Sequence, residues 1–267
     1  MKIAGCCFCL RKLLLFVVII LQSTPSAICL AGNNSNKRHK PLAKRSTKDA
    51  LIIEQGLKER GFSYVIGSDE SGRGCIAGGL ITASCCILEA ATESIIQGVD
   101  DSKRLTKESR DRIHQEILSK PDIFVWSVAT KSSQEIDDIT LEQATQDCFQ
   151  ESIDDVIQQL RQRVDFNPKN VEHTSIYSII DGNKSPNLNP ITSRAWKRGD
   201  EMVYSVALAS IIARCHHEKI ITGLAAEFPL YQFDKNGCYA SRQHTEALHQ
   251  HGPSPVHRQS CKPVKGR

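Results

Sequence analysis

The sequence has no long apolar run, and after residue 45 it has no zinc-type pairing of cysteines. Its longest unbroken apolar run covers residues 13–21, whereas a helix that crosses a bilayer needs about 20 such residues. The seven cysteines after residue 45 include no pair spaced as Cys-x-x-Cys, so we do not expect a structural zinc site. Because seven is an odd number and these cysteines stand in apolar stretches, the sequence predicts buried free thiols in a reducing compartment, not a disulfide framework.

Acidic residues are missing from the first 45 positions. The whole chain has 34 Lys and Arg against 30 Asp and Glu, a formal net charge of +4. Eight of the basic residues lie in 1–45, so residues 46–267 hold 26 basic and 30 acidic residues, a net charge of −4. The positive balance therefore belongs to the N-terminal segment, and the rest of the chain is not a basic nucleic-acid binder by bulk charge.

Residues 1–31 have the three-part layout of a secretory signal. Arg11 and Lys12 precede the apolar run, and small residues after it place a cleavage site behind Ala27 or Ala31. Residues 32–60 continue as a basic, Ser/Asn-rich transit-like segment and a linker or short amphipathic helix. Together they predict an organelle reached through the secretory route, a complex plastid being suspected, with no stable membrane association after processing. The alternatives are a membrane anchor or buried strand, a mis-started reading frame, secretion, or a cytoplasmic or nuclear location.

Residues 61–264 alternate between strand and helix patterns and predict one α/β domain. Strands are expected over 64–68, 75–88, 123–130 and 176–180. Helices are expected from about Thr106 (its N-cap), over about 139–160, over about 201–228, and over 242–251. This order indicates a mixed sheet followed by a helical portion from about residue 201.

Acidic residues stand at the ends of two predicted strands. Asp69 and Glu70 follow the first, Asp181 follows the fourth, and Asp200 precedes the long helix. Open α/β sheets place their chemistry at strand ends, and just past the end both Asp69 and Glu70 can turn towards one site. Carboxylates without His or Cys suit Mg²⁺ or Mn²⁺, and two such ions can promote phosphodiester cleavage. Each acid alone is equally compatible with a solvated turn or, for Asp200 above all, with a helix N-terminus.

Seven blocks of the sequence carry a resemblance to a known family. They read SDESGRGCIAGG, GVDDSKRLTKESR, DDITLEQATQ, IIDGNKSPNL, WKRGD…SVALASIIAR, FPLYQF…GCYASRQHTEAL and GPSPVHRQSCKPV. In this order, over roughly residues 62–264, they resemble ribonuclease HII, the type 2 ribonuclease H. The resemblance implies a ribonuclease H-like mixed β-sheet flanked by helices with a small helical C-terminal extension. It also implies an endonuclease that cuts the RNA strand of RNA–DNA hybrids and single ribonucleotides embedded in duplex DNA.

The resemblance assigns roles residue by residue. The four catalytic metal ligands, which would hold two Mg²⁺ or Mn²⁺ ions, fall on Asp69, Glu70, Asp181 and Asp200. Hydrolysis on the 5′ side of the ribonucleotide would leave a 3′-hydroxyl and a 5′-phosphate, for ribonucleotide and primer removal by a monomer. The implied substrate contacts are the turn Gly72, Arg73 and Gly74, the sugar-packing Tyr239, and the phosphate-contacting Lys103 and Lys184. The alternatives are an ordinary tight turn, a core tyrosine and solvated lysines, and for the whole chain a hybrid-binding relative with impaired catalysis.

Several positions depart from the family pattern. Ser71 stands where alanine is usual, Cys75 and Gly79 where proline is usual, and His217 where an arginine is expected, so a fixed cation is lost. Around Tyr239, NGCYAS replaces the usual HKGYPT, which removes a lysine. His257 and Arg258 are expected to brace the C-terminal loop. We expect surface positions on helices for five late histidines: His216, His217, His244, His249 and His251.

Overall fold

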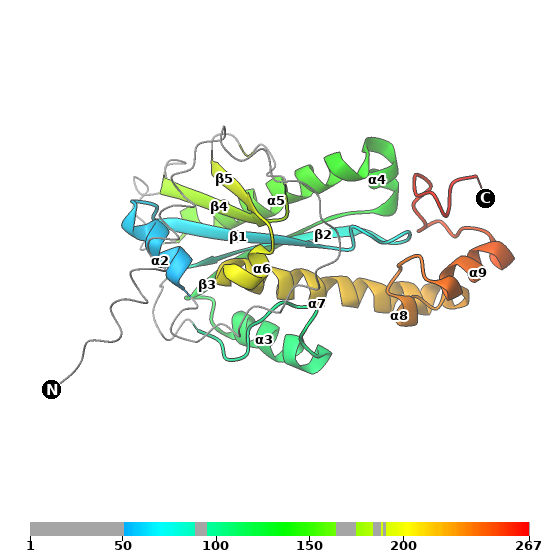
Figure 1. Cartoon of the computed structure of the whole chain (residues 1–267), viewed down its shortest axis with the longest axis horizontal. Coiled ribbons are helices and arrows are strands. Elements are labelled where there is room, and N and C mark those ends of the chain that lie inside the picture. Colours follow the sequence, from blue (N-terminus) through cyan, green and yellow to red (C-terminus); the bar gives the residue numbers. More distant parts are fainter. Residues whose placement is uncertain (1–50, 89–94, 164–174, 184–187, 189–190, 267) are drawn as a thin grey trace, which may run out of the picture. The chain divides into compact units, whose positions relative to one another are not determined.

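The computed structural model describes residues 51–88, 95–163, 175–183, 188 and 191–266. These residues form a mixed sheet with strand order β3-β2-β1-β4-β5 and helices on both faces (Figure 1). None of the helices in these ranges is both long enough and apolar enough to span a membrane. The predicted signal-like segment, nearly all of the transit-like segment, and Lys184 lie outside the described residues.

The strands follow the predicted order with one addition. β1 (Tyr64–Ser71), β2 (Leu80–Ile87) and β3 (Phe124–Lys131) are antiparallel neighbours, whereas β4 (Ile176–Asp181) runs parallel to β1. The sequence patterns miss β5 (Thr192–Trp196), which pairs in parallel with β4. Only Trp196 is buried in this short edge strand. The strand therefore has no alternation of apolar and polar residues from which it could be predicted.

The described helices also follow the prediction, with two differences. Thr106 is the N-cap of α3, as expected, because its side chain accepts a hydrogen bond from Ser109 N. A separate helix α4 precedes α5, and the helix expected over 201–228 is divided at Val203, whose backbone is extended. The bounds are α2 Ile52–Glu59, α3 Lys107–Ser119, α4 Ser133–Ile139, α5 Leu141–Arg161, α6 Gly199–Met202, α7 Tyr204–Glu227, α8 Phe233–Asn236 and α9 Arg242–His251, with a 3₁₀ turn at Pro229–Tyr231.

Side chains of β2 alternate between two hydrophobic cores, one on each face of the sheet. Ile81 and Cys85 pack with the apolar side of α7, and Cys86 packs with α5. Full burial of an isoleucine such as Ile81 contributes about 1.5–3 kcal/mol of hydrophobic free energy. Two polar links fix α5 on its face: Thr82 Oγ1 donates to the Cys148 carbonyl at 2.7 Å, and Ser84 Oγ lies 2.8 Å from Ser152 Oγ. The sheet is therefore held between α7 and α5 (Figure 1).

The N-terminus of α7 is tied to both β1 and α2. Ser205 N and Oγ donate to Glu54 Oε1 at 2.8 and 2.9 Å, so a carboxylate from α2 satisfies a free donor in the first turn of α7. Glu54 is buried, and Leu57 of the same helix is fully buried. α2 therefore packs as part of the fold, although the sequence patterns place the start of the domain near residue 61.

The helical C-terminal extension packs against the loop that follows β1. Figure 1 shows α8 beside the later part of α7, and α9 and the C-terminal end beyond the tip of the β1–β2 hairpin. Cys75, Ile76 and Ala77 of the hairpin form a core with Phe233 and Leu248 of the extension. The seven cysteines of the described residues are free thiols, of which all but Cys261 are buried, as predicted.

Candidate active site

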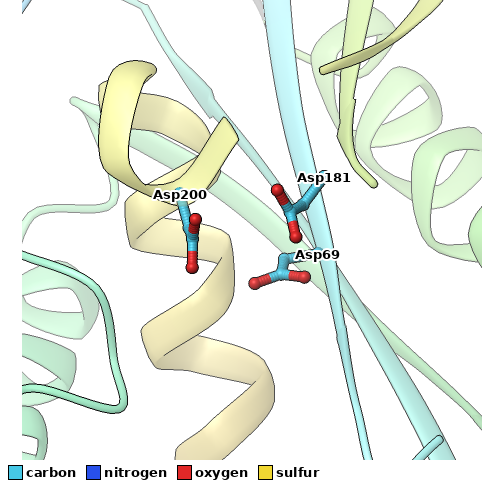
Figure 2. Close-up of side chains that lie close together, drawn as sticks. All are labelled: Asp69, Asp181 and Asp200. Atoms are coloured by element: carbon cyan, nitrogen blue, oxygen red, sulfur yellow. The ribbon is translucent and has the colours of Figure 1, made fainter. Parts of the chain in front are cut away.

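Three aspartates converge where β1 and β4 meet α6 (Figure 2). β1 and β4 are parallel and in register from Tyr64 to Ser68, so Asp69 and Asp181 stand side by side at the ends of the ladder. Asp200 comes from α6, opposite the two strands. One carboxylate oxygen from each aspartate lies within 4.8 Å of the others. The structure thus brings together three of the acids that the sequence predicts at one site.

Backbone geometry at the start of α6 delivers Asp200. Arg198 adopts the left-handed conformation, with φ of 61°, and turns the chain from β5 into α6. Gly199 N then donates to Asp181 Oδ1 at 2.6 Å, so the strand carboxylate satisfies a free backbone donor in the first turn of α6. Asp200 lies in the first turn of α6 and is not its N-cap, which leaves its carboxylate directed towards the cluster.

A pair of serines that the sequence patterns do not single out supports Asp69 from the side of α7. The Ser210 hydroxyl hydrogen-bonds Asp69 and counteracts the rise of the pKa of that carboxyl. Ser102 Oγ lies 2.8 Å from Ser210 Oγ, and both serines are buried. Both belong to blocks that resemble the family, but serines in apolar runs are common, so the pattern alone gives no sign of their contact with Asp69.

Burial and mutual repulsion disfavour the charged forms of the three aspartates. Burial, followed by the charges of Glu70 and Asp181, raises the pKa of Asp69 well above its usual range. Burial and then Asp181 raise the pKa of Asp200 to about 6. Burial also raises the pKa of Asp181. A divalent cation would relieve this repulsion, and three hard oxygen donors are the ligands that Mg²⁺ and Mn²⁺ prefer. The residues therefore fit a site for such an ion.

Glu70 lies outside the cluster of three aspartates. We expected the strand to end before Asp69 so that both acids turn the same way, but β1 continues through Ser71. Side chains alternate along a strand, and Ser68, two residues before Glu70, faces α5 through Ser84. Glu70 is still near enough for the Asp181 charge to raise its pKa, after the larger effect of burial. Its role as a metal ligand stays a prediction.

Lys103 is a basic residue close to the cluster. Partial burial lowers the pKa of Lys103, but the carboxylates of Asp69, Asp200 and other neighbours outweigh this effect and raise it above 10.5. The lysine is therefore charged and lies close to the aspartates. Its role as a phosphate contact stays a prediction. Lys184, the other predicted phosphate contact, is outside the described residues.

The loop after β1 places the predicted substrate-contacting residues together. Gly72 has φ of +85°, and a Cβ there would lie 2.8 Å from Gly79 O, so only glycine fits. A Cβ on Gly74 would lie 3.3 Å from Tyr239 Cε1, which shows that the loop and the tyrosine ring are in contact distance. The Tyr239 side chain is exposed, and Arg73 pairs with Glu142 of α5 at 2.6 Å. The substrate-binding roles of these residues remain predictions.

Three departures from the family pattern lie against one another. Ser71 Oγ is 3.1 Å from His217 Nδ1, and Cys75 Sγ is 3.8 Å from His217 Nε2. Burial lowers the pKa of His217 to about 4, so the imidazole is neutral at pH 7. The prediction of surface histidines is wrong for His217 and also for His244, because each packs inside the fold where the sequence pattern gives no indication of burial.

Comparison with known proteins decides the family. A family model for ribonuclease HII matches residues 66–264. A ribonuclease HII of Caldicellulosiruptor bescii is 33% identical over 206 residues, which cover 77% of this chain and 90% of the relative. The chain belongs to the ribonuclease HII family. It is therefore a metal-dependent endonuclease with ribonuclease H activity on RNA–DNA hybrids.

Solved structures agree with the ribonuclease HII assignment at the level of the fold. The ribonuclease HII of Archaeoglobus fulgidus, solved in a complex with PCNA, has a TM-score of 0.58 at 22% identity and covers 74% of this chain and 95% of its own. Bst-RNase HIII, solved with Mn²⁺, has a TM-score of 0.58 at 17% identity and covers 88% of this chain and 75% of its own. The predicted ribonuclease H-like fold is confirmed.

The raised pKa values predict how pH and metal affect stability. The pKa of Asp200 rises from 3.8 to about 6 on folding, so between these values the unfolded chain loses its proton first and the free energy of unfolding falls with rising pH. We expect the metal-free protein to lose stability through this site over that range, and Mg²⁺ to restore it at pH 7. Thermal melts of metal-free wild type and Asp200→Asn at pH 4 to 7 measure this loss of stability, because the variant has no titrating carboxyl at position 200. Surface acids such as Glu135 contribute equally to both proteins. A melting-temperature difference that does not change with pH would contradict the prediction.

Proposed function

We propose that this protein cleaves DNA duplexes at embedded ribonucleotides, as well as the RNA strand of RNA–DNA hybrids. Hydrolysis on the 5′ side of the ribonucleotide would leave a 3′-hydroxyl and a 5′-phosphate. The observation that carries the proposal is the short connection between the aspartate cluster and the predicted substrate-contacting residues. Gly72, Arg73 and Gly74 directly follow the strand that bears Asp69, and Tyr239 lies against Gly74.

Different residues of the chain have different roles in the proposed reaction. Asp69, Asp181 and Asp200 would hold one or two Mg²⁺ or Mn²⁺ ions, with Glu70 as the predicted fourth ligand. Bound divalent ions supply an activated water and stabilise the leaving oxygen in phosphodiester hydrolysis. Lys103 would attract the substrate phosphate, and Ser210 holds Asp69 in one orientation through a hydrogen bond.

Recognition of the ribonucleotide would come from the loop and the tyrosine. The 2′-hydroxyl is the group that distinguishes RNA from DNA at a given position, and glycines allow the backbone to approach it closely. The exposed Tyr239 ring provides a surface for packing against the following sugar. Binding does not require an overall basic protein, because a few local cations suffice to contact phosphates.

The test uses a DNA duplex with one ribonucleotide in one strand. We expect a single cut on the 5′ side of that ribonucleotide with Mg²⁺ or Mn²⁺, no cut with EDTA, and no cut of the all-DNA duplex. A wild-type chain that binds RNA–DNA hybrid without cutting either substrate would contradict the proposal and favour a hybrid-binding relative with impaired catalysis.

We also infer a location and an oligomeric state. The layout of residues 1–60 supports import into an organelle through the secretory route, with a complex plastid as the proposed destination. A fluorescent fusion of residues 1–60 tests this, and a cytoplasmic signal would contradict it.

The large exposed apolar side chains among the described residues stand on different elements, which supports a monomer. Light scattering that gives the mass of a dimer would contradict the monomer.

A further inference from the structure

We propose that His257 and Arg258, consecutive residues of the C-terminal extension, are positioning residues for ribonucleotide recognition. Arg258 holds the backbone of the loop that contains Gly72 and Arg73, and His257 holds the backbone of Tyr239 through His244. The inference rests on the proposed function, because it assigns a cause to the placement of the two elements that would contact the ribonucleotide. It goes beyond bracing of the C-terminal loop, since the residues that are held belong to the site.

Arg258 donates all of its described hydrogen bonds to the backbone around the loop. Nη2 donates to Gly72 O at 2.8 Å and to Gly79 O at 2.9 Å, Nη1 donates to Arg73 O at 3.1 Å, and Nε donates to Gly78 O at 3.0 Å. The side chain is fully buried, and no ion pair of Arg258 is found among the described residues. The planar guanidinium thus joins both ends of the loop in one fixed geometry.

Backbone contacts add to this connection. Arg258 N donates to Ile76 O at 2.9 Å, Gly78 N donates to Val256 O at 2.8 Å, and Ile76 N donates to Cys238 O at 2.9 Å. The loop after β1 is therefore joined to the residue just before Tyr239 and to the segment around Arg258. Asp137 of α4 fixes that segment in turn, because it accepts hydrogen bonds from Gln259 N and Ser260 N.

A directional chain of hydrogen bonds leads from His257 to Tyr239. Ser254 N donates to His257 Nδ1 at 2.9 Å, so this nitrogen carries no proton and the proton of the neutral ring is on Nε2. His257 Nε2 lies 2.9 Å from His244 Nε2, which must then accept. His244 Nδ1 carries the remaining proton and donates to Tyr239 O at 2.9 Å.

This arrangement is consistent only when both rings are neutral. Both histidines are buried, and Tyr231 and Phe233 pack around them. Each ring nitrogen is paired with a group in the matching donor or acceptor role, so the two rings are held in one orientation. The Tyr239 backbone is consequently fixed from inside the extension while its ring faces solvent beside Gly74.

The first experiment compares Arg258→Lys with Arg242→Lys in the full chain. Lysine keeps the charge but cannot span four carbonyls, whereas Arg242 is an exposed arginine on α9 outside the site. For the duplex with one ribonucleotide we expect R258K to lower kcat/KM at least about tenfold, mainly through KM, because small displacements of binding groups have such effects. The Mn²⁺ affinity measured by calorimetry is expected to stay unchanged, and R242K to behave as wild type.

Hydrogen exchange tests the same step without reference to activity. Amides of residues 75–78 are expected to exchange faster in R258K than in wild type, while those of β4 are unchanged. Unchanged exchange in this loop, or an unchanged KM, would overturn the role of Arg258. If wild type leaves the duplex uncut while exchange responds as expected, the proposed function fails but the positioning of the loop by Arg258 stands.

The second experiment tests the path through His257. His257→Asn keeps a polar group near Ser254 but does not reach His244, whereas His257→Gln places an NH₂ donor near the position of Nε2. We expect H257N to lower kcat/KM about tenfold and H257Q to restore part of the loss. In a Y239A background, H257N should have no further effect, because the side chain that it displaces is gone. A full additional loss in that background would show a merely structural role and overturn the inference, as would a similar loss in the exposed control His249→Gln. If R258K does not fold, the His257 variants alone test the proposal.

Discussion

Asp69→Asn is expected to reduce metal-dependent cleavage by about 10³-fold or more while it stabilises the metal-free protein. Asp69 belongs to the cluster, beside its strand neighbour Asp181 and across from the helix residue Asp200 (Figure 2). Asparagine preserves the volume and can still accept the Ser210 hydroxyl, but it removes the negative charge that a divalent ion requires. Rates measured at saturating Mg²⁺ on the ribonucleotide-containing duplex test the loss.

The stability effect has the opposite sign because the carboxylates of the metal-free wild-type site repel one another. Burial and the nearby carboxylates raise the pKa of Asp69, so its charged form is disfavoured by folding at pH 7. Melting temperatures in EDTA at pH 7 should therefore be higher for Asp69→Asn than for wild type, and Mg²⁺ should stabilise the variant less. Asp122→Asn, at an exposed turn position before β3, is the matched control and should change neither quantity. A variant that keeps wild-type turnover, or melts lower than wild type in EDTA, would contradict this account.

The part of the site that sequence reasoning could predict is the part that strand topology determines. Strand ends that carry acids were visible at Asp69 and Asp181, and parallel pairing of β1 and β4 is enough to bring them together. Asp200 is a candidate from its place before a predicted helix, but an acid at that place is ambiguous, and the resemblance strengthens its assignment as a metal ligand. What places it at the cluster is the left-handed turn at Arg198, which is a local backbone conformation without a sequence pattern of its own.

The rest depends on packing between segments that are distant in the sequence. Ser210 can hydrogen-bond Asp69 only because α7 packs against β1. His244 is buried only because His257, in the segment that follows α9, packs against it. The exact end of β1 also decided the direction of Glu70, and strand ends are less well defined by apolar patterns than strand centres. Sequence patterns therefore identify the acids and the strands β1 to β4, whereas β5 and the supporting contacts required the tertiary structure.

Gly67→Ala is expected to destabilise the fold strongly, because it forces a helix away from the central strand. Gly67 lies in β1 where the N-terminal turn of α7 approaches the sheet, and a Cβ there would lie 2.3 Å from both Ser205 C and Val206 N. These contacts are with backbone atoms, so no side-chain rotation can relieve them, and β1 and α7 must move apart. Since overpacking of a core costs about 1–3 kcal/mol and sometimes more, we expect a loss of about 3 kcal/mol or more in the free energy of unfolding.

The same movement should reduce activity, because α7 carries Ser210 and follows α6 with Asp200. Gly223→Ala on α7 is the matched control: nothing lies within 4 Å of a Cβ at that position, and alanine favours a helix interior over glycine by about 0.5–1 kcal/mol. Urea unfolding of the two variants and wild type measures both effects, and cleavage rates below the unfolding transition separate misplacement of the site from loss of folded protein. A G67A protein as stable as wild type would mean that α7 lies farther from β1 than the Gly67 contacts require. In that case contacts of α7 other than the one at Gly67 would have to set the position of Ser210 beside Asp69.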